Sequence, residues 1–335
     1  MLLAPVRTTL DFWHGMNRLV GDLVMPPWEG PHPVAVFVDG YGPGGRDQGS
    51  WPQRLAAAGI ASFAYDKPGC GESTGDWTVQ TLQDRAAEVT VAIDLLREQP
   101  GLAAGGVALL GSGQGSWVSL LAAGGSGVGA VVVTSGPALG PLDLEQFRLA
   151  GRMGAAGFGA AEIALAQSLL RERVRRLTSG EGPDSVLASE AAVHRAAWYR
   201  LMPGATSEEI AYVARLAAFD PRPALVALRC PLLALYGEND VFLPVERNVG
   251  ILTETLEAAR HGDHGVIVIP GADHALRVHA GSQPAELVDG RYVSSEVAPG
   301  VFELIVTWLD RRLGRIEGRP NVVELPRDQI PLPRY

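Results

Sequence analysis

The sequence has few of the residues that mark several classes of protein. Only two cysteines, Cys70 and Cys230, occur in 335 residues, too few for a disulfide framework and without the spacing of a zinc site. Acidic residues outnumber basic ones by 37 to 28, giving a formal net charge of −9. That charge would repel a phosphate backbone. We therefore expect no metal, no nucleic-acid partner and a cytoplasmic location.

Long apolar runs are also missing. None approaches the roughly 20 residues that cross a bilayer, and the first residues lack the pattern of a signal peptide. Because 47% of the residues are hydrophobic, the chain can still bury a full core. We expect a globular protein without a membrane partner. A homo-oligomer is left open, since the proline-containing tail, 314–335, could pack on its own body or on a neighbour.

What the sequence does contain is an alternation of short apolar runs with segments of helical spacing. The runs are continuous and rich in Val, Ile and Leu, which is typical of parallel strands buried on both faces. Residues 17–26 alternate instead, like an outer antiparallel strand. The buried strands are expected at 34–40, 60–66, 106–111, 129–136, 231–237 and 265–271, and helices at 47–58, 81–98, 114–123, 245–259 and 301–313. This pattern predicts an α/β fold with a mostly parallel central sheet flanked by helices.

One long segment, 141–223, interrupts the alternation. It has no convincing strand and several helical patterns rich in Ala, Arg and Glu, as an inserted helical lid would. We therefore expect a core formed by 1–140 and 224–313, a helical lid at 141–223 and the tail at 314–335.

The stretch 107–123, VALLGSGQGSWVSLLAA, predicts a strand, a glycine turn and a helix. A dinucleotide fingerprint would need a third glycine at Ser116 and an acidic residue after the next strand, and both are missing. The other interpretation is a nucleophile elbow, G-x-S-x-G, framed by Gly111 and Gly115. Gly113 then stands at the nucleophile position, where serine is expected.

Two residues farther along the chain fit the elbow. Asp240 follows the strand at 231–237, and His274 follows the strand at 265–271, in the order nucleophile, acid, histidine. His274 would act as general base and then acid, while Asp240 would fix its tautomer. Glu238 and Asp273 are the nearby carboxylates that could be mistaken for the acid.

An oxyanion hole requires two backbone N–H groups. One comes from the residue after the nucleophile and the other from the loop after the first parallel strand. These positions are occupied by Gln114 and Tyr41. Arg46 and Asp47, next in that loop, either pair to hold it or begin the next helix.

These motifs resemble the serine esterase and aminopeptidase-like branch of the α/β-hydrolase superfamily. VDGYGPGGRD resembles its HGSGPxDRD loop, YDKPGCGESTGDW its YDKRGxGxSxGD stretch and LLGSGQGSW its GHSQGG elbow, while YGENDVFLP and PGADHAL resemble its acid and histidine loops. The resemblance covers about 17–313 apart from the lid and implies an α/β-hydrolase fold. Asp39 and Gly113 depart from it, standing where the branch has histidine and serine. Cys70 is a weaker candidate nucleophile, because it lies on a different loop.

Glycine at the elbow leaves two hypotheses. In the first, the chain is a serine hydrolase for ester, thioester or amide substrates whose nucleophile has been replaced by Gly113, leaving a folded and inactive form. In the second, Gly113 is native, and the protein is a small-molecule binding module or a lyase or cyclase that uses His274. Losing such a nucleophile costs about a millionfold in turnover.

The lid would select the acyl substrate. Its large apolar residues could line an acyl or ring-binding cavity, although such residues often form a lid's own core. An apolar lid also leaves cyclisation open as an alternative to hydrolysis. No cofactor is implied. The candidate lining residues are Phe147, Met153, Phe158, Trp198, Tyr199, Leu201 and Met202.

Overall fold

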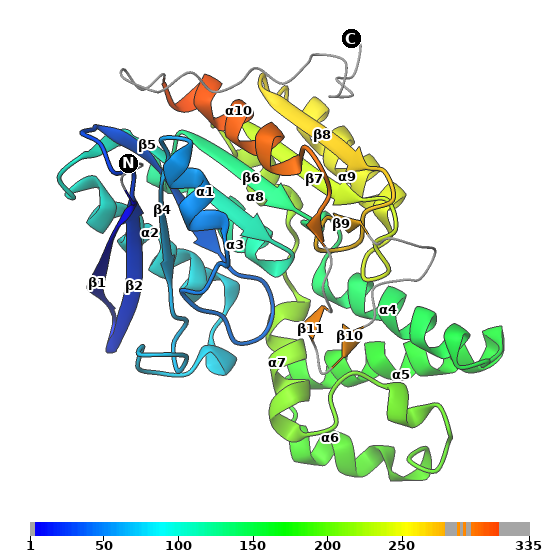
Figure 1. Cartoon of the computed structure of the whole chain (residues 1–335). Coiled ribbons are helices and arrows are strands. Elements are labelled where there is room, and N and C mark those ends of the chain that lie inside the picture. The colour runs from blue at the N-terminus through cyan, green and yellow to red at the C-terminus, as the bar shows by residue number, and fades with distance from the viewer. Residues whose placement is uncertain (1–3, 279–286, 289–290, 293–295, 315–335) are drawn as a thin grey trace.

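The computed structural model describes residues 4–278, 287–288, 291–292 and 296–314. Its centre is an eight-stranded sheet with the strand order β1-β2-β4-β3-β5-β6-β7-β8 (Figure 1). The strands are β1 (Val6–His14), β2 (Asn17–Met25), β3 (His32–Val38), β4 (Ala61–Tyr65), β5 (Leu102–Ser112), β6 (Ala130–Thr134), β7 (Leu232–Gly237) and β8 (His264–Ile269). The predicted tail lies outside the described residues from 315 onward.

The sheet is parallel from β4 across to β8 and antiparallel at its other end. β2 pairs antiparallel with both β1 and β4, whereas β3, β4, β5, β6, β7 and β8 run parallel. The six predicted parallel strands are therefore confirmed, but β8 is not fully buried as expected, because it forms the other edge of the sheet. The strand expected at 17–26 is antiparallel as predicted, but it is not the outermost strand, because β1 pairs beyond it and forms the edge. Most of the side chains of β1 are exposed, so it lacks the apolar run that identified the others.

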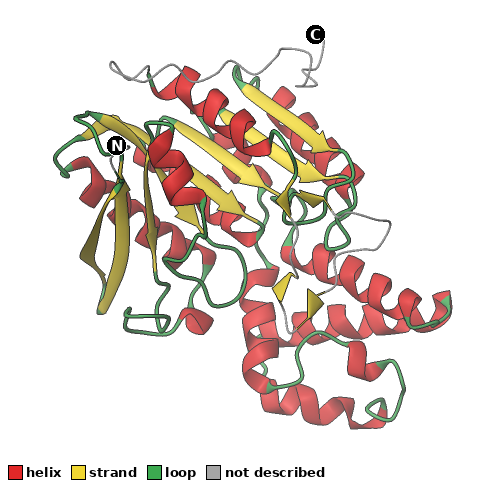
Figure 2. Cartoon of the chain, viewed as in Figure 1, coloured by secondary structure: helices red, strands yellow, loops and turns green. Residues whose placement is uncertain are grey.

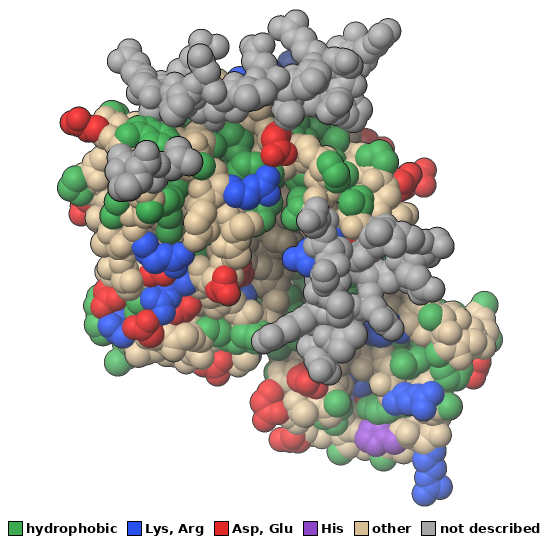
Figure 3. Space-filling view, in the orientation of Figure 1, with side chains coloured by type: hydrophobic (Ala, Val, Ile, Leu, Met, Phe, Trp, Pro, Cys, Tyr) green, Lys and Arg blue, Asp and Glu red, His purple; other side chains and the backbone are tan. Residues whose placement is uncertain are grey.

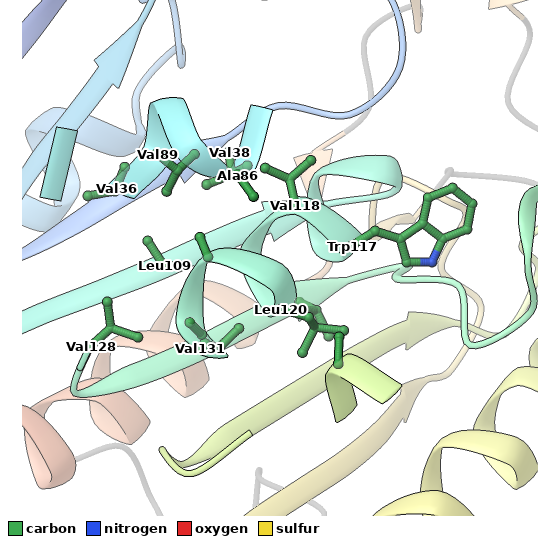
Figure 4. Close-up of a cluster of buried hydrophobic side chains, with 14 of the residues drawn as sticks. Val36, Val38, Ala86, Val89, Leu109, Trp117, Val118, Leu120, Val128 and Val131 are labelled. Atoms are coloured by element: carbon green, nitrogen blue, oxygen red, sulfur yellow. The ribbon is translucent and has the colours of Figure 1, made fainter. Parts of the chain in front are cut away.

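Helices cover both faces of the sheet (Figure 2). One face is packed by α2 (Leu82–Arg97), α3 (Gln114–Ser126), α8 (Arg222–Ala227) and α9 (Val245–Ala258). Figure 4 shows Ala86 and Val89 of α2 and Val118 and Leu120 of α3 beside the strand residues of this cluster. The other face is packed by α1 (Trp51–Ala57) and α10 (Val301–Leu313). The predicted fold class is confirmed. We call the sheet with these six helices the body.

A helical insertion follows β6. It comprises α4 (Pro141–Ala155), α5 (Ala160–Thr178), α6 (Pro183–Ser189), the short helices η2 (Glu190–Ala192) and η3 (Tyr199–Leu201), and α7 (Ser207–Ala217). We call residues 141–217 the insertion. It has a small apolar core of its own, centred on Leu149, Leu170 and Trp198. The next helix, α8, packs Leu225 into the core of the body.

The remaining described elements are short. η1 (Trp77–Val79) precedes α2. β9 (Arg277–Val278) pairs with β12 (Glu296–Val297), and β10 (Leu287–Val288) pairs with β11 (Arg291–Tyr292). None of the helices in the described ranges combines the length and apolarity needed to cross a membrane. On the face drawn in Figure 3, acidic and basic side chains of the body lie interspersed.

Candidate active site

The turn between β5 and α3 has the geometry of an elbow. Gly113 links them with φ 51° and ψ −118°, a conformation that costs most residues about 1–3 kcal/mol and glycine little. Gly115 is required by space, because a Cβ there would lie 2.0 Å from the Val38 carbonyl oxygen. The strand, tight turn and helix expected at 107–123 are therefore present, with Gly113 at the apex.

Asp240 and His274 meet beside this turn. His274 Nδ1 lies 2.6 Å from Asp240 Oδ2, so the carboxylate accepts a hydrogen bond from Nδ1–H and leaves Nε2 to accept a proton. Asp240 Oδ1 accepts from the N–H groups of Phe242 and Leu243 at 2.8 and 3.3 Å. The Asp240 side chain is fully buried, and that of His274 is 21% exposed. The two residues thus have the relative geometry that an acid–histidine pair requires.

The imidazole faces the apex of the elbow. An ideal Cβ built on Gly113 would lie 3.5 Å from His274 Nε2 and would meet no other heavy atom within 4 Å among its non-neighbours. A serine at this position would therefore place its hydroxyl within reach of the base. Gly113, Asp240 and His274 therefore lie together and follow the predicted order of nucleophile, acid and histidine along the chain.

Ser135 also holds the histidine, and sequence reasoning missed it. It follows β6 with φ 48°, one of the positive values outside glycine in the described chain. Its side chain is buried, and Oγ–H donates to the His274 carbonyl oxygen at 2.7 Å. A strained backbone at a non-glycine residue is a common feature of functional sites. The His274 backbone is thus fixed by Ser135 while its ring is fixed by Asp240.

The two expected oxyanion donors lie on adjoining segments. Gln114 is the first residue of α3, where backbone N–H groups have no partner within the helix. The loop that carries Tyr41 passes close by: a Cβ on Gly40 would lie 2.9 Å from the Ser112 carbonyl oxygen and 3.8 Å from Gln114 N. The structure therefore brings the backbone next to Tyr41 close to that of Gln114, as an oxyanion hole requires.

Side chains connect Gln114 and Tyr41 to three other segments, α2, η1 and α7. Gln114 Oε1 accepts from Arg85 Nη1 at 2.8 Å and from the Tyr212 hydroxyl of α7 at 3.2 Å. The Tyr41 ring is 71% exposed and contacts the rings of Trp77 and Tyr212, with centroids 5.9 and 5.6 Å away. Partial burial, then the charges of Glu209 and Glu145, raise the pKa of the Tyr41 hydroxyl. The insertion therefore contacts the site through Tyr212, and its carboxylates act on the Tyr41 hydroxyl through their charge.

Asp39 and Arg46 hold the loop from its two ends. Asp39 Oδ1 accepts from Gln48 Nε2 at 3.0 Å. Arg46 does not pair with Asp47; its Nε lies 2.9 Å from Asp66 Oδ2 and its Nη2 2.5 Å from Glu72 Oε1. Both residues thus shape the loop. Cys70, which lies on the neighbouring loop, is a free and partly buried thiol.

The apolar residues expected to line a substrate cavity pack instead on one another. Trp198 and Met202 are buried in the core of the insertion, with Phe158 and Tyr199 packed against them. The Tyr199 hydroxyl donates to Glu190 Oε2 at 2.6 Å. Phe147 is exposed. A substrate-binding role for Trp198, Tyr199, Phe158 and Met202 thus rests on the sequence prediction, and their contacts here are internal to the insertion.

A cavity of about 1330 Å³ borders the site from the side of α1 and α10. Phe37, Leu110 and Thr134 of three adjacent strands are part of its lining. Its lining also includes Ser112, which precedes Gly113 of the elbow, and Ala275, which follows His274. Within the described ranges, no group of His, Cys, Asp and Glu residues is arranged to hold a metal ion.

Comparison with known proteins agrees with the fold. The profile of the Alpha/beta hydrolase family matches residues 12–290. The chain belongs to this family. No curated protein sequence matches it.

Several solved structures are similar to this chain. An esterase from Pyrococcus furiosus is 14% identical, with a TM-score of 0.58 and coverage of 92% of each chain. DcsB in complex with its substrate analogue is 15% identical, with a TM-score of 0.58 and coverage of 92% of this chain and 99% of that one. Porphyromonas gingivalis dipeptidyl peptidase 4 is 12% identical with a TM-score of 0.57, and the match covers 92% of this chain and 36% of that one. At these identities the likeness shows the fold.

Proposed function

We propose that the protein carries the acyl-transfer site of a serine hydrolase in a nucleophile-deficient form, with Gly113 in place of the serine. One observation carries the proposal: a Cβ at Gly113 would stand 3.5 Å from His274 Nε2, while the Asp240–His274 pair is intact at 2.6 Å. In this proposal, the nucleophile's side chain is the one missing part. The chain would then bind an ester, thioester or amide without forming an acyl-enzyme.

With serine at position 113, the chemistry follows from the geometry. The serine Oγ forms a bond to the carbonyl carbon while its proton moves to His274 Nε2, and the oxyanion faces the N–H groups of Gln114 and Tyr41. The bond to the leaving group then breaks as His274 returns the proton to it. Water then bonds to the acyl carbon as its proton moves to His274 Nε2, and the bond from the carbon to the serine Oγ breaks as His274 passes the proton to Oγ, which releases the acid. With glycine, the donors and the base remain, but no covalent bond can form.

The insertion lies over the site as a lid in this proposal. Among the described residues, three side-chain hydrogen bonds join it to the rest of the chain: Tyr212 to Gln114, Arg148 Nε to the Phe242 carbonyl oxygen at 2.9 Å, and Arg215 Nη1 to the Thr78 carbonyl oxygen at 2.6 Å. Phe242 in turn packs its ring on His274, with centroids 5.3 Å apart. The substrate would therefore enter between the insertion and the elbow.

The decisive experiment introduces the missing hydroxyl. We expect Gly113→Ser to gain hydrolysis of short-chain p-nitrophenyl esters, by up to about a millionfold over the glycine chain. It should also take a single fluorophosphonate adduct, measured by intact mass. Gly113→Ala is the matched control, since it adds the Cβ without the hydroxyl, and Gly113→Ser/His274→Ala should lose both signals.

A folded Gly113→Ser protein that stays inert and unlabelled would contradict the proposal. The second hypothesis would then lead, because Nε2 of His274 faces open space at Gly113 and could take a proton from a bound molecule directly. Ligand screening of the glycine chain, with His274→Ala as the control, would test it.

A further inference from the structure

Lys67 is the only lysine in the sequence, among 28 basic residues. It follows β4 and is buried, with 4% of the residue exposed. Its Nζ donates to the carbonyl oxygens of Gly40 and Gly42 at 2.6 and 2.8 Å. Tyr41, the expected oxyanion donor, lies between these two residues. The single lysine of the chain is thus bound to both sides of Tyr41.

Because the peptide bond is planar, this contact also fixes the direction of the Tyr41 N–H group. In a trans peptide, the carbonyl of one residue and the N–H of the next point in opposite directions. The Gly40 carbonyl points to Lys67, so the Tyr41 N–H points away from it. Gly40 itself lies against the elbow, at the Ser112 carbonyl and Gln114 N. One residue earlier, Arg85 Nη2 donates to the Asp39 carbonyl oxygen at 2.6 Å.

We propose that Lys67 is a positioning residue for the oxyanion hole: it fixes the Tyr41 peptide and polarises its N–H through the Gly40 carbonyl. A donor at one end of a peptide group strengthens the hydrogen bond made at the other end, and the effect is larger when the donor is charged. The inference rests on the proposed function for the role of Tyr41. The contacts that hold the loop stand independently of it.

The surroundings favour lysine over arginine at this position. A tetrahedral ammonium is a compact charge that can donate to two nearby carbonyls, whereas a guanidinium is a larger planar fork. The stem is tightly enclosed, since a Cβ on Gly44 would lie 2.9 Å from Lys67 Cε. The Trp77 ring, 5.7 Å from Nζ, lies near the ammonium group. An arginine side chain would therefore displace the loop it is meant to hold.

The charge on Lys67 changes in the neutral range. Burial, followed by the charge of Arg85 on α2, lowers the pKa of Lys67 to about 7. Asp39, Cys70 and Glu88 oppose the shift. Burial raises the pKa of Glu88 to about 7 as well. The polarising charge is therefore present below pH 7 and lost above it.

The first experiment uses the glycine chain and needs no activity. Lysine labelled at its side-chain carbons and nitrogen gives one lysine signal, and ¹⁵N-tyrosine reports the Tyr41 amide. We expect the Lys67 signal and the Tyr41 amide to titrate together, with a midpoint near pH 7, and the Tyr41 shift to disappear in Lys67→Met. Glu88→Gln should retain it. A Tyr41 amide that is unchanged in Lys67→Met, or that still titrates there, would overturn the proposal.

The second experiment measures catalysis in the Gly113→Ser protein. Adding Lys67→Met should lower kcat by about 10²–10³-fold, as loss of one oxyanion donor does, with KM changed less than threefold. It should also remove a descending limb near pH 7 from the kcat profile. Arg97→Met is the matched control, because Arg97 donates to the carbonyls of Ser126 and Gly127 far along α3.

The two experiments separate the two proposals. If Gly113→Ser is inert, the hydrolase proposal fails, and the amide titration still decides whether Lys67 holds and polarises the loop. If Gly113→Ser is active and Lys67→Met changes kcat no more than Arg97→Met does, the positioning role is wrong.

Discussion

Two buried arginines, Arg85 in the body and Arg173 in the insertion, have very different partners. Arg173 faces a carboxylate, with Nε and Nη2 lying 2.9 and 2.6 Å from the two oxygens of Glu190, and its Nη1 also donates to the Pro203 carbonyl oxygen at 2.6 Å. Arg85 donates instead to an amide oxygen, Gln114 Oε1, and to the Asp39 carbonyl. In the insertion, one buried charge neutralises another. In the body, the charge is directed at the loop and the elbow that flank the candidate oxyanion hole.

The difference separates structural from functional burial of charge. A buried ion pair whose members satisfy each other contributes little net stability but is costly to break. A buried cation bound to backbone carbonyls orients peptide groups without being neutralised. We therefore expect changes in the body to alter catalysis, and changes in the insertion to alter mainly the free energy of unfolding. Four substitutions test this, beginning with the largest effect.

The largest effect is expected at Asp240. In the Gly113→Ser protein, Asp240→Asn should lower kcat by about 10⁴-fold, because the amide would stabilise the wrong tautomer of His274. Ester hydrolysis measures it. Glu238→Gln is the matched control: Glu238 Oε2 accepts from the Gly271 N–H at 2.8 Å in the same region, and its kcat should change less than threefold. Equal losses would show that the loop, and not the Asp240–His274 pair, matters.

The next largest effect is expected in the insertion. Arg173→Met should lower the free energy of unfolding by about 3–5 kcal/mol, because it leaves Glu190 buried and unpaired. Chemical denaturation measures it. The kcat of Gly113→Ser/Arg173→Met should stay within a few fold at temperatures where the protein is folded. Replacing Glu190 by leucine as well should recover much of the loss. A loss of kcat comparable to that of Lys67→Met would contradict the comparison.

The sequence predicts the strands and the candidate site residues better than it predicts the residues that hold them in position. Continuous apolar runs identify the parallel strands. Because these strands run in the same direction, Gly113, Asp240 and His274 lie together at their carboxyl ends. β1 escapes this logic, since its mostly exposed side chains carry no apolar period. The glycine at position 115 is also predictable, because two backbones approach so closely there that no side chain fits.

Lys67, Arg85 and Ser135 could not be predicted in the same way. Each acts on a backbone carbonyl distant in sequence: Gly40 lies 27 positions from Lys67, and His274 lies 139 from Ser135. A bond to a carbonyl requires no particular residue type at the acceptor, so no motif records it. The solitary lysine was the one available signal. The apolar residues of the insertion show the converse, because helical spacing cannot tell a lid's core from a substrate lining.

The smallest effect concerns the contact between the two regions. Tyr212→Phe removes one hydrogen bond from the insertion to the elbow, at 3.2 Å from Gln114 Oε1. Arg85 still satisfies that oxygen, so no buried acceptor is left unpaired. We expect a loss of about 0.5–1 kcal/mol in the free energy of unfolding, at the low end for a neutral hydrogen bond.

Tyr199→Phe applies the same change within the insertion. The Tyr199 hydroxyl donates to the charged Glu190, a bond worth about 1.5–3 kcal/mol, and burial, then this contact, raises its pKa to about 12. Denaturation curves should therefore show the larger loss for Tyr199→Phe. In the Gly113→Ser protein the order should reverse for KM, since only Tyr212 touches the elbow. If Tyr199→Phe raises KM as much as Tyr212→Phe does, the charge network of the insertion serves the site as well as the fold.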